Sequence, residues 1–111
     1  MDIKRIKFER TGGFAGIRFA AEFDLDDLPE EQAHQILELL DDLDFDELPE
    51  KIFGEQQIAD GFSYSITVIT QKRQHSVMTT DTSAPKGMEP LLELLTRIAR
   101  QQARNKKRSL S

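Results

Sequence analysis

Two histidines are the first candidates for chemistry in this sequence. His34 lies one helical turn before Glu38, and His75 begins a strand-like run. A zinc site on the helix would need a second histidine on the same face, as in the H-E-x-x-H arrangement, and there is none. We therefore interpret His34 and Glu38 as a surface pair. His75 is expected to pack or to form a hydrogen bond and not to titrate in a reaction.

Three aspartates test the chain for calcium binding. Asp42, Asp44 and Asp46 have the first, third and fifth positions of an EF-hand loop. Glu47 stands where that loop requires glycine, and Phe53 stands where it requires a bidentate carboxylate. The match fails at both discriminating positions, so we do not predict a calcium site.

Phosphate binding and glycoside hydrolysis are also not predicted. The glycine-rich segment 12–16 has no Lys-Ser/Thr pair after it and connects two strand-like runs, so it is not a phosphate loop. Paired carboxylates for glycoside chemistry would need a cleft, and a chain of 111 residues offers no obvious room for one. The sequence therefore predicts a protein that binds a partner, with no catalytic residues, no cofactor and no metal of its own.

The same glycine-rich segment is expected to form the tip of a β-hairpin. Ile6 and Phe8 alternate with charged residues before it, and apolar residues from Ile17 to Phe23 alternate after it. Glycines permit the positive φ angles that tight connections need. Phe14 is a large apolar side chain at this tip, where polar residues are usual. Two interpretations stay open: Phe14 folds back onto the sheet, or it is presented to a partner that buries it.

Length and composition limit the class of protein. A chain of 111 residues fits one domain with one core. It has no cysteine, which excludes disulfides and thiolate metal sites and fits a reducing compartment. No signal-peptide core is visible, and no apolar run approaches the roughly 18 residues of a membrane span. We expect a soluble cytoplasmic protein with a single domain over residues 1–104 and a flexible basic tail over residues 105–111.

Charge is unevenly distributed along the chain. Residues 22–50 contain many acids and no lysine or arginine, whereas residues 97–108 contain basic side chains and no acid. The net charge of −5 argues against nucleic acid as a partner. We interpret the basic segment as a helix C-terminus that complements the helix dipole. Contact with an acidic partner surface is the alternative interpretation.

Hydrophobic periodicity predicts the element order ββαββα. Strands are expected over residues 3–9, 16–24, 62–68 and 75–80, and residues 50–61 are expected to connect the first helix to the third strand. One helix opens at residues 28–31, with proline in its first position, and the other begins near residues 87–89. Their apolar stripes are Ala33, Ile36, Leu37, Leu40 and Leu43, and Leu91, Leu92, Leu95, Ile98 and Ala99. The predicted fold is α+β, with two helices packed on a four-stranded antiparallel sheet.

Strand pairing decides which loops share an end of this sheet. Either the fourth or the third predicted strand could pair with the second. If the fourth does, the loop over residues 81–86 lies at the same end as Phe14. An apolar tip and a loop that bears a carboxylate would then form one surface. Asp81 has a second interpretation, in which it caps the turn before Pro85 or accepts hydrogen bonds from the amides of Ser83 and Ala84.

A family resemblance rests on several motifs in a fixed order. The most specific is Gly-Gly-Phe-Ala-Gly at residues 12–16. The others are Asp-Leu-Pro-Glu-Glu (27–31), Leu-Pro (48–49), Phe-x-Tyr-x-Ile-x-Val (62–68), and Val77, Asp81, Pro85 and Pro-Leu-Leu (90–92). With these motifs the chain resembles the emfourin family, bacterial cytoplasmic proteins that inhibit protealysin-like enzymes, which are zinc metallopeptidases of the thermolysin family. The resemblance covers nearly the whole chain up to Arg100.

The resemblance implies that two neighbouring loops insert into the active-site cleft of the peptidase. Carried over by position, Asp81 is the candidate carboxylate for the catalytic zinc of the enzyme, and Asp60 is the competing aspartate. Phe14 and Ala15 are the candidates for the substrate subsites. The expected contact residues are Gly13, Phe14, Ala15, Gly16, Thr82 and Ser83. The implied partner is a thermolysin-like zinc metallopeptidase bound by a monomer in a 1:1 complex.

Two other classes of function stay open. The chain could be a small cytoplasmic adaptor or dimerisation domain that uses the edge of the hairpin and inhibits nothing. It could also be an acidic mimic that binds a basic protein through residues 22–50.

Overall fold

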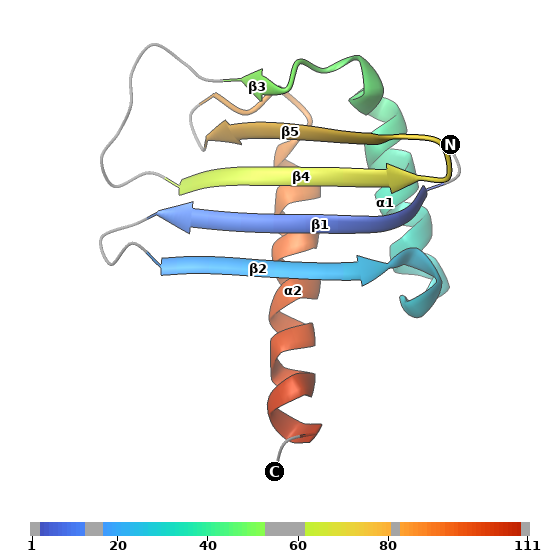
Figure 1. Cartoon of the computed structure of the whole chain (residues 1–111), viewed down its shortest axis with the longest axis vertical. Coiled ribbons are helices and arrows are strands. Elements are labelled where there is room, and N and C mark those ends of the chain that lie inside the picture. Colours follow the sequence, from blue (N-terminus) through green and yellow to red (C-terminus); the bar gives the residue numbers. More distant parts are fainter. Residues whose placement is uncertain (1–2, 13–16, 53–61, 81–82, 110–111) are drawn as a thin grey trace.

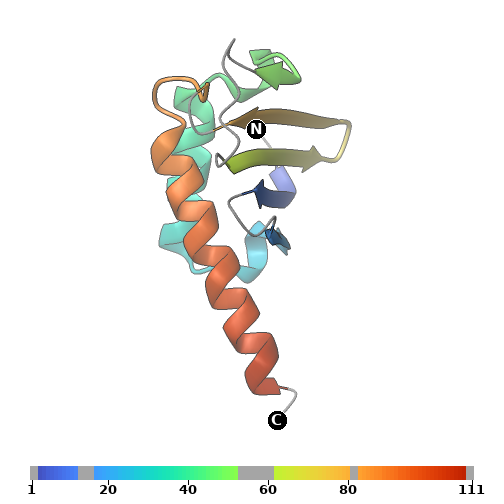
Figure 2. The same cartoon turned by 90° about the vertical axis from the view of Figure 1, so that its left-hand side faces the viewer.

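The computed structural model describes residues 3–12, 17–52, 62–80 and 83–109, with only the backbone described for residues 17 and 103–109. The architecture has two layers, a sheet and a pair of helices that both lie on one face of it (Figures 1 and 2). The strands are β1 (Ile3–Gly12), β2 (Ile17–Asp24), β3 (Lys51–Ile52), β4 (Phe62–Thr70) and β5 (Gln74–Thr80). The helices are α1 (Glu30–Asp42) and α2 (Glu89–Ser109), with short 3-10 turns η1 (Leu25–Asp27) and η2 (Phe45–Glu47).

The sheet has five strands in the order β2-β1-β4-β5-β3. The α+β class is confirmed, but the prediction of four antiparallel strands is wrong in detail. β3 lies within the predicted connector and pairs in parallel with β5, through Lys51 with Met78 and Ile52 with Thr79. A two-residue strand is too short to produce a visible alternation in the sequence.

The assumed pairing of the second and fourth predicted strands is also wrong. β4 pairs with β1, and β5 pairs with β4, so β5 lies two strands away from β1 and three from β2. The strands β1 and β4 occupy the centre of the sheet, with neighbours on both sides. Their central position explains why their inward side chains, such as Phe8 and Ile66, are buried.

Alternation along each strand separates a buried face from an exposed one. On the buried face Ile6 pairs with Phe23 of β2 and with Val68 of β4, and all three are in the core. The opposite face is polar and charged. There the exposed Arg5 guanidinium donates to Asp24 and Glu22 at 2.7 and 2.9 Å, and these bonds raise the pKa of Arg5. Exposed pairs of this kind add little stability.

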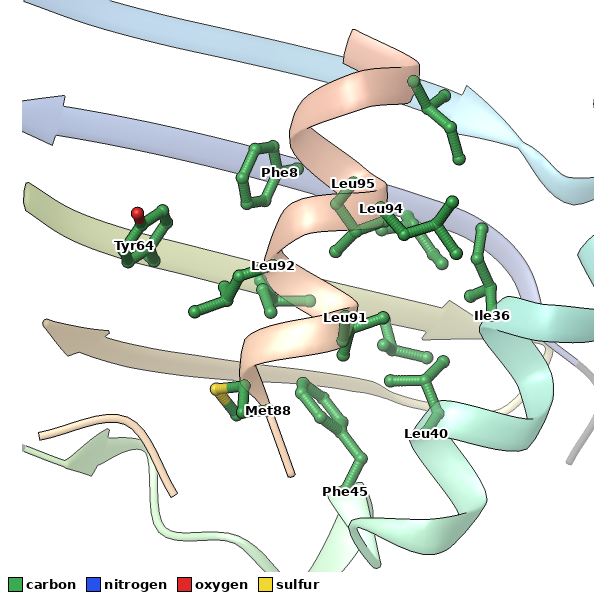
Figure 3. Packing of buried hydrophobic residues seen from close by; sticks show 14 of the residues in the cluster. Phe8, Ile36, Leu40, Phe45, Tyr64, Met88, Leu91, Leu92, Leu94 and Leu95 are labelled. Carbon is green, nitrogen blue, oxygen red and sulfur yellow. The ribbon is translucent and has the colours of Figure 1, made fainter. Parts of the chain in front are cut away.

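The helices supply the other half of the core. In α1 the predicted stripe is confirmed, since Ile36 and Leu40 are buried and Ala33, Leu37 and Leu43 are partly buried against them. Pro29 precedes α1 as its N-cap and does not occupy its first turn. In α2 the five predicted stripe residues are all buried, together with Leu94. Figure 3 shows these leucines converging with Phe45 of η2 and Phe8 of β1.

The last helix is longer than the sheet is wide. α2 crosses the sheet from the β5 side to the β2 side and continues beyond β2 (Figure 1). It ends at Ser109, so residues 105–109 of the predicted tail continue its backbone, and the flexibility of the tail stays a prediction. No helix in the described part of the chain has the length and apolar character needed to cross a bilayer.

Candidate functional site

Three segments, 13–16, 53–61 and 81–82, separate the described ranges. The residues that flank these segments lie at one end of the sheet. Gly12 pairs with both Ile17 and Phe62, and Thr80 pairs with Ser63. β3 runs parallel to β5, so Ile52 ends at the same place. We call this the Gly12 end of the sheet, and it lies on the left in Figure 1. The opposite end, where β4 turns into β5, is called the Thr70 end.

Most of the candidate site residues lie outside the described residues. They are Gly13, Phe14, Ala15, Gly16, Asp60, Asp81 and Thr82. Their neighbours in sequence, Gly12, Ile17, Thr80 and Ser83, are described. The flanks of segments 13–16 and 81–82 share one end of the sheet. The sequence suggested this arrangement only through a pairing of the second and fourth predicted strands, and that pairing is wrong. Alternating antiparallel pairing from β1 through β4 to β5 gives the same direction to β1 and β5.

Ser83 is the one candidate contact residue that the structure describes, and it is bonded inward. Its hydroxyl donates to the carbonyl oxygen of Ile52 at 3.1 Å and is also hydrogen-bonded to the Thr80 hydroxyl. Thr79 Oγ1 donates to the same Ile52 oxygen at 2.9 Å. Ser83 is partly buried. Its position therefore fixes the chain that follows segment 81–82 against the end of β3.

The amides that follow Asp81 have a backbone acceptor. Ser83 N and Ala84 N donate to the carbonyl oxygen of Thr80 at 3.2 and 3.0 Å. Both amides are therefore already paired, and they do not need Asp81 as an acceptor.

Arg10 is the residue at this end that sequence reasoning missed. It occupies an inward position of β1, two residues after Phe8, and pairs with Phe19 and Tyr64. Its guanidinium carbon lies 3.8 Å from the centre of the Phe62 ring and 5.9 Å from that of Tyr64. Cations are favoured over aromatic faces. The signal was present in the sequence, because a charge in the inward phase of an alternating strand is unusual.

A groove of about 820 Å³ opens between the Gly12 end of the sheet and the adjacent side of α2. Arg10 and Tyr64 line it from the sheet, and Ala84, Pro85 and Lys86 line it from the segment that leads into α2. The α2 side contributes Gly87, Glu89, Leu92, Glu93, Thr96, Arg97, Arg100 and Gln101. In Figure 3, Tyr64 lies at the margin of the core with Leu92 extending toward it, so these two side chains separate core from groove.

Both histidines make the kind of contact that the sequence predicted. His34 and Glu38 form an exposed pair at 3.1 Å. His75 Nε2 lies 2.9 Å from the Leu48 carbonyl oxygen, and its ring packs edge-on against Phe45 at 5.5 Å. Within the described ranges, no group of three or more His, Asp or Glu residues is arranged to hold a metal ion.

The family of the chain follows from its sequence over these same elements. A sequence model of the Emfourin family matches residues 8–96, from β1 into α2. The chain belongs to the emfourin family. The resemblance inferred from the motifs is thus confirmed. The matched range includes Arg10, the candidate aspartates Asp60 and Asp81, and residues 89–96 at the start of α2.

One solved structure of a relative is similar to this chain. It is emfourin from Serratia proteamaculans, described as an inhibitor of M4 family peptidases. The identity is 20%, the match covers 83% of this chain and 88% of that one, and the TM-score is 0.46. No curated protein matches this chain.

Proposed function

We propose that this protein inhibits a zinc metallopeptidase of the thermolysin family and is not an enzyme. Membership of the emfourin family and the description of the Serratia relative support this proposal. The absence of cysteine is compatible with action in the cytoplasm. The partner we propose is a protealysin-like enzyme bound in a 1:1 complex.

The observation that carries the mode of inhibition is the common end of the sheet. The flanks of segments 13–16 and 81–82 are brought together there by the register of β1, β4 and β5. Both segments can therefore insert into one cleft. In the proposal, Phe14 and Ala15 occupy substrate subsites, and Asp81 reaches the zinc.

The chemistry of such a complex follows from the two kinds of side chain. A catalytic zinc keeps an open position that water fills. A carboxylate oxygen that displaces this water stops the enzyme from generating its nucleophile. One carboxylate is a weak zinc ligand, so burial of Phe14, which contributes about 2 kcal/mol, supplies much of the affinity.

An inhibition assay with a purified protealysin-like peptidase tests the proposal. The wild-type protein should inhibit, and Asp81→Asn should raise the inhibition constant by about tenfold or more, equivalent to about 1.4 kcal/mol. Asn keeps the size of the side chain and removes its charge. The assay is repeated at high salt, where long-range steering is screened, because loss of a zinc ligand persists there.

Asp60→Asn is the matched variant. If it weakens inhibition while Asp81→Asn does not, the zinc role moves to Asp60. If the wild-type protein leaves the peptidase fully active at micromolar concentration, the inhibitor proposal is wrong. The adaptor or dimerisation interpretation then takes its place, with β2 as the edge strand.

A further inference from the structure

We infer that the groove beside α2 is a second contact surface, which accepts an acidic segment of the inhibited peptidase. The inference rests on the proposed function and extends it to residues outside the inserted segments. The groove lies at the Gly12 end of the sheet, and its lining residues Ala84, Pro85 and Lys86 come after segment 81–82, with Ser83 between them. A peptidase that holds that segment would therefore lie close to the groove.

The Arg10 guanidinium is poised to bind a carboxylate. Its Nε atom is buried and has no hydrogen-bond partner, the one such side-chain atom among the described residues. The Phe62 ring, whose centre lies 3.8 Å from the guanidinium carbon, contacts the cation without using its N–H donors. A guanidinium binds a carboxylate through two parallel N–H bonds, and a fixed plane loses less entropy when it does so. Because Nε is shielded from solvent, the carboxylate would accept from the other N–H donors of the guanidinium.

The α2 side of the groove adds further positive charge. Arg97 and Arg100 are one helical turn apart, both line the groove, and both are exposed. With Arg10 and Lys86 they make four basic side chains against two acidic ones, Glu89 and Glu93, in a protein whose net charge is −5. Across the described part of the chain, none of the four basic residues forms a salt bridge. The groove is thus a local basic patch on an acidic protein.

The charge is graded along the groove. α2 begins on the β5 side of the sheet and crosses toward β2, so Glu89 and Glu93 come before Arg97 and Arg100 in that direction (Figure 1). Arg10 is on β1, toward which the basic end of the groove points. An acidic side chain would therefore settle at the end lined by Arg10, Arg97 and Arg100. At the other end Glu89 and Glu93 outnumber the one basic side chain, Lys86, so repulsion there favours one direction of the segment.

The test compares two double charge reversals in the peptidase inhibition assay. Arg97→Glu with Arg100→Glu changes the groove, and Lys72→Glu with Arg73→Glu makes the same change of charge at the Thr70 end. Both control residues are exposed, and Arg73 has one pair, with Asp46 at 3.4 Å. The groove variant should raise the inhibition constant at least tenfold at about 0.15 M salt, and the control variant should change it less than about threefold.

Arg10→Met provides a second test. Methionine keeps an apolar contact with Phe62 and removes the N–H donors, including the unpaired buried one, so it should weaken inhibition severalfold without lowering the midpoint of thermal unfolding. If the double reversal does not fold, Arg97→Gln with Arg100→Gln replaces it, with the same expected direction.

The outcomes separate the two proposals. Wild-type inhibition with a selective loss in the groove variants supports both. If the wild-type protein inhibits and the groove variants inhibit as well as the control variant, the groove proposal is wrong and the inhibitor proposal stands. A wild-type protein that does not inhibit overturns both.

Discussion

The two ends of the sheet are built in different ways. At the Thr70 end, three residues join β4 to β5, and Thr70 Oγ1 accepts hydrogen bonds from the amides of Lys72 and Arg73 at 3.4 and 3.1 Å. Phe45 and His75 pack beside this turn. At the Gly12 end, a basic groove lies beside the flanks of segments 13–16, 53–61 and 81–82.

This difference assigns separate roles to the ends. Local hydrogen bonds and apolar packing dominate the Thr70 end, so substitutions there should act on the free energy of unfolding. The Gly12 end places charged and aromatic groups next to open space, as in surfaces that bind a partner. Substitutions there should act on inhibition.

The largest effect should come from Phe45→Ala, which tests the Thr70 end. Phe45 is fully buried and its ring contacts His75, so its loss should reduce the free energy of unfolding by about 3–5 kcal/mol. Urea unfolding followed by circular dichroism measures this change. The inhibition constant of the protein that remains folded should not change. A large loss of affinity without loss of stability would contradict the separation of the two ends.

Phe14→Ala makes the opposite test at the Gly12 end. The inhibition constant should rise by about tenfold or more, because a large apolar contact with the peptidase is lost. The free energy of unfolding should stay within about 0.5 kcal/mol of the wild-type value. A stability loss above 1–2 kcal/mol with unchanged inhibition would mean that Phe14 folds back onto the sheet.

The smallest effect is expected from truncation after Gln102. The chain beyond this residue adds basic charge and no apolar anchor that the sequence identifies, so inhibition in moderate salt should change less than about tenfold. Gln102 itself is kept because its Nε2 donates to the carbonyl oxygen of Glu22 at 3.1 Å. A tenfold or greater loss would place the end of α2 in the interface.

The sequence predicted the elements better than their arrangement. Alternation identified the long strands because one face of each is buried, and helical stripes identified α1 and α2 because the core contains them. Strand order was not predictable in the same way, since Val68 would be equally buried beside β1 or β2. β3 was missed because its two residues are held by β5, whose Thr79 hydroxyl donates to Ile52, and β5 is distant from β3 in the sequence.

The candidate site was only partly accessible to sequence reasoning. Its expected residues came from a motif, and the structure adds the shared end of the sheet that brings their flanks together. The groove could not be predicted, because Arg10 and Arg97 line the same groove only when α2 lies across the sheet. The inward phase of Arg10 was the one sign of it along the chain.

The Ile52 carbonyl has a consequence for redesign of this scaffold. One oxygen accepts from Thr79 and from Ser83, and so ties β3, β5 and the chain before α2 at a single point. Foreign sequences of different length grafted between residues 52 and 62, or between 80 and 83, would start and finish at anchors that the core already holds. Such grafts would keep the hydrogen bonds among Ile52, Thr79 and Ser83, because none of these residues is replaced.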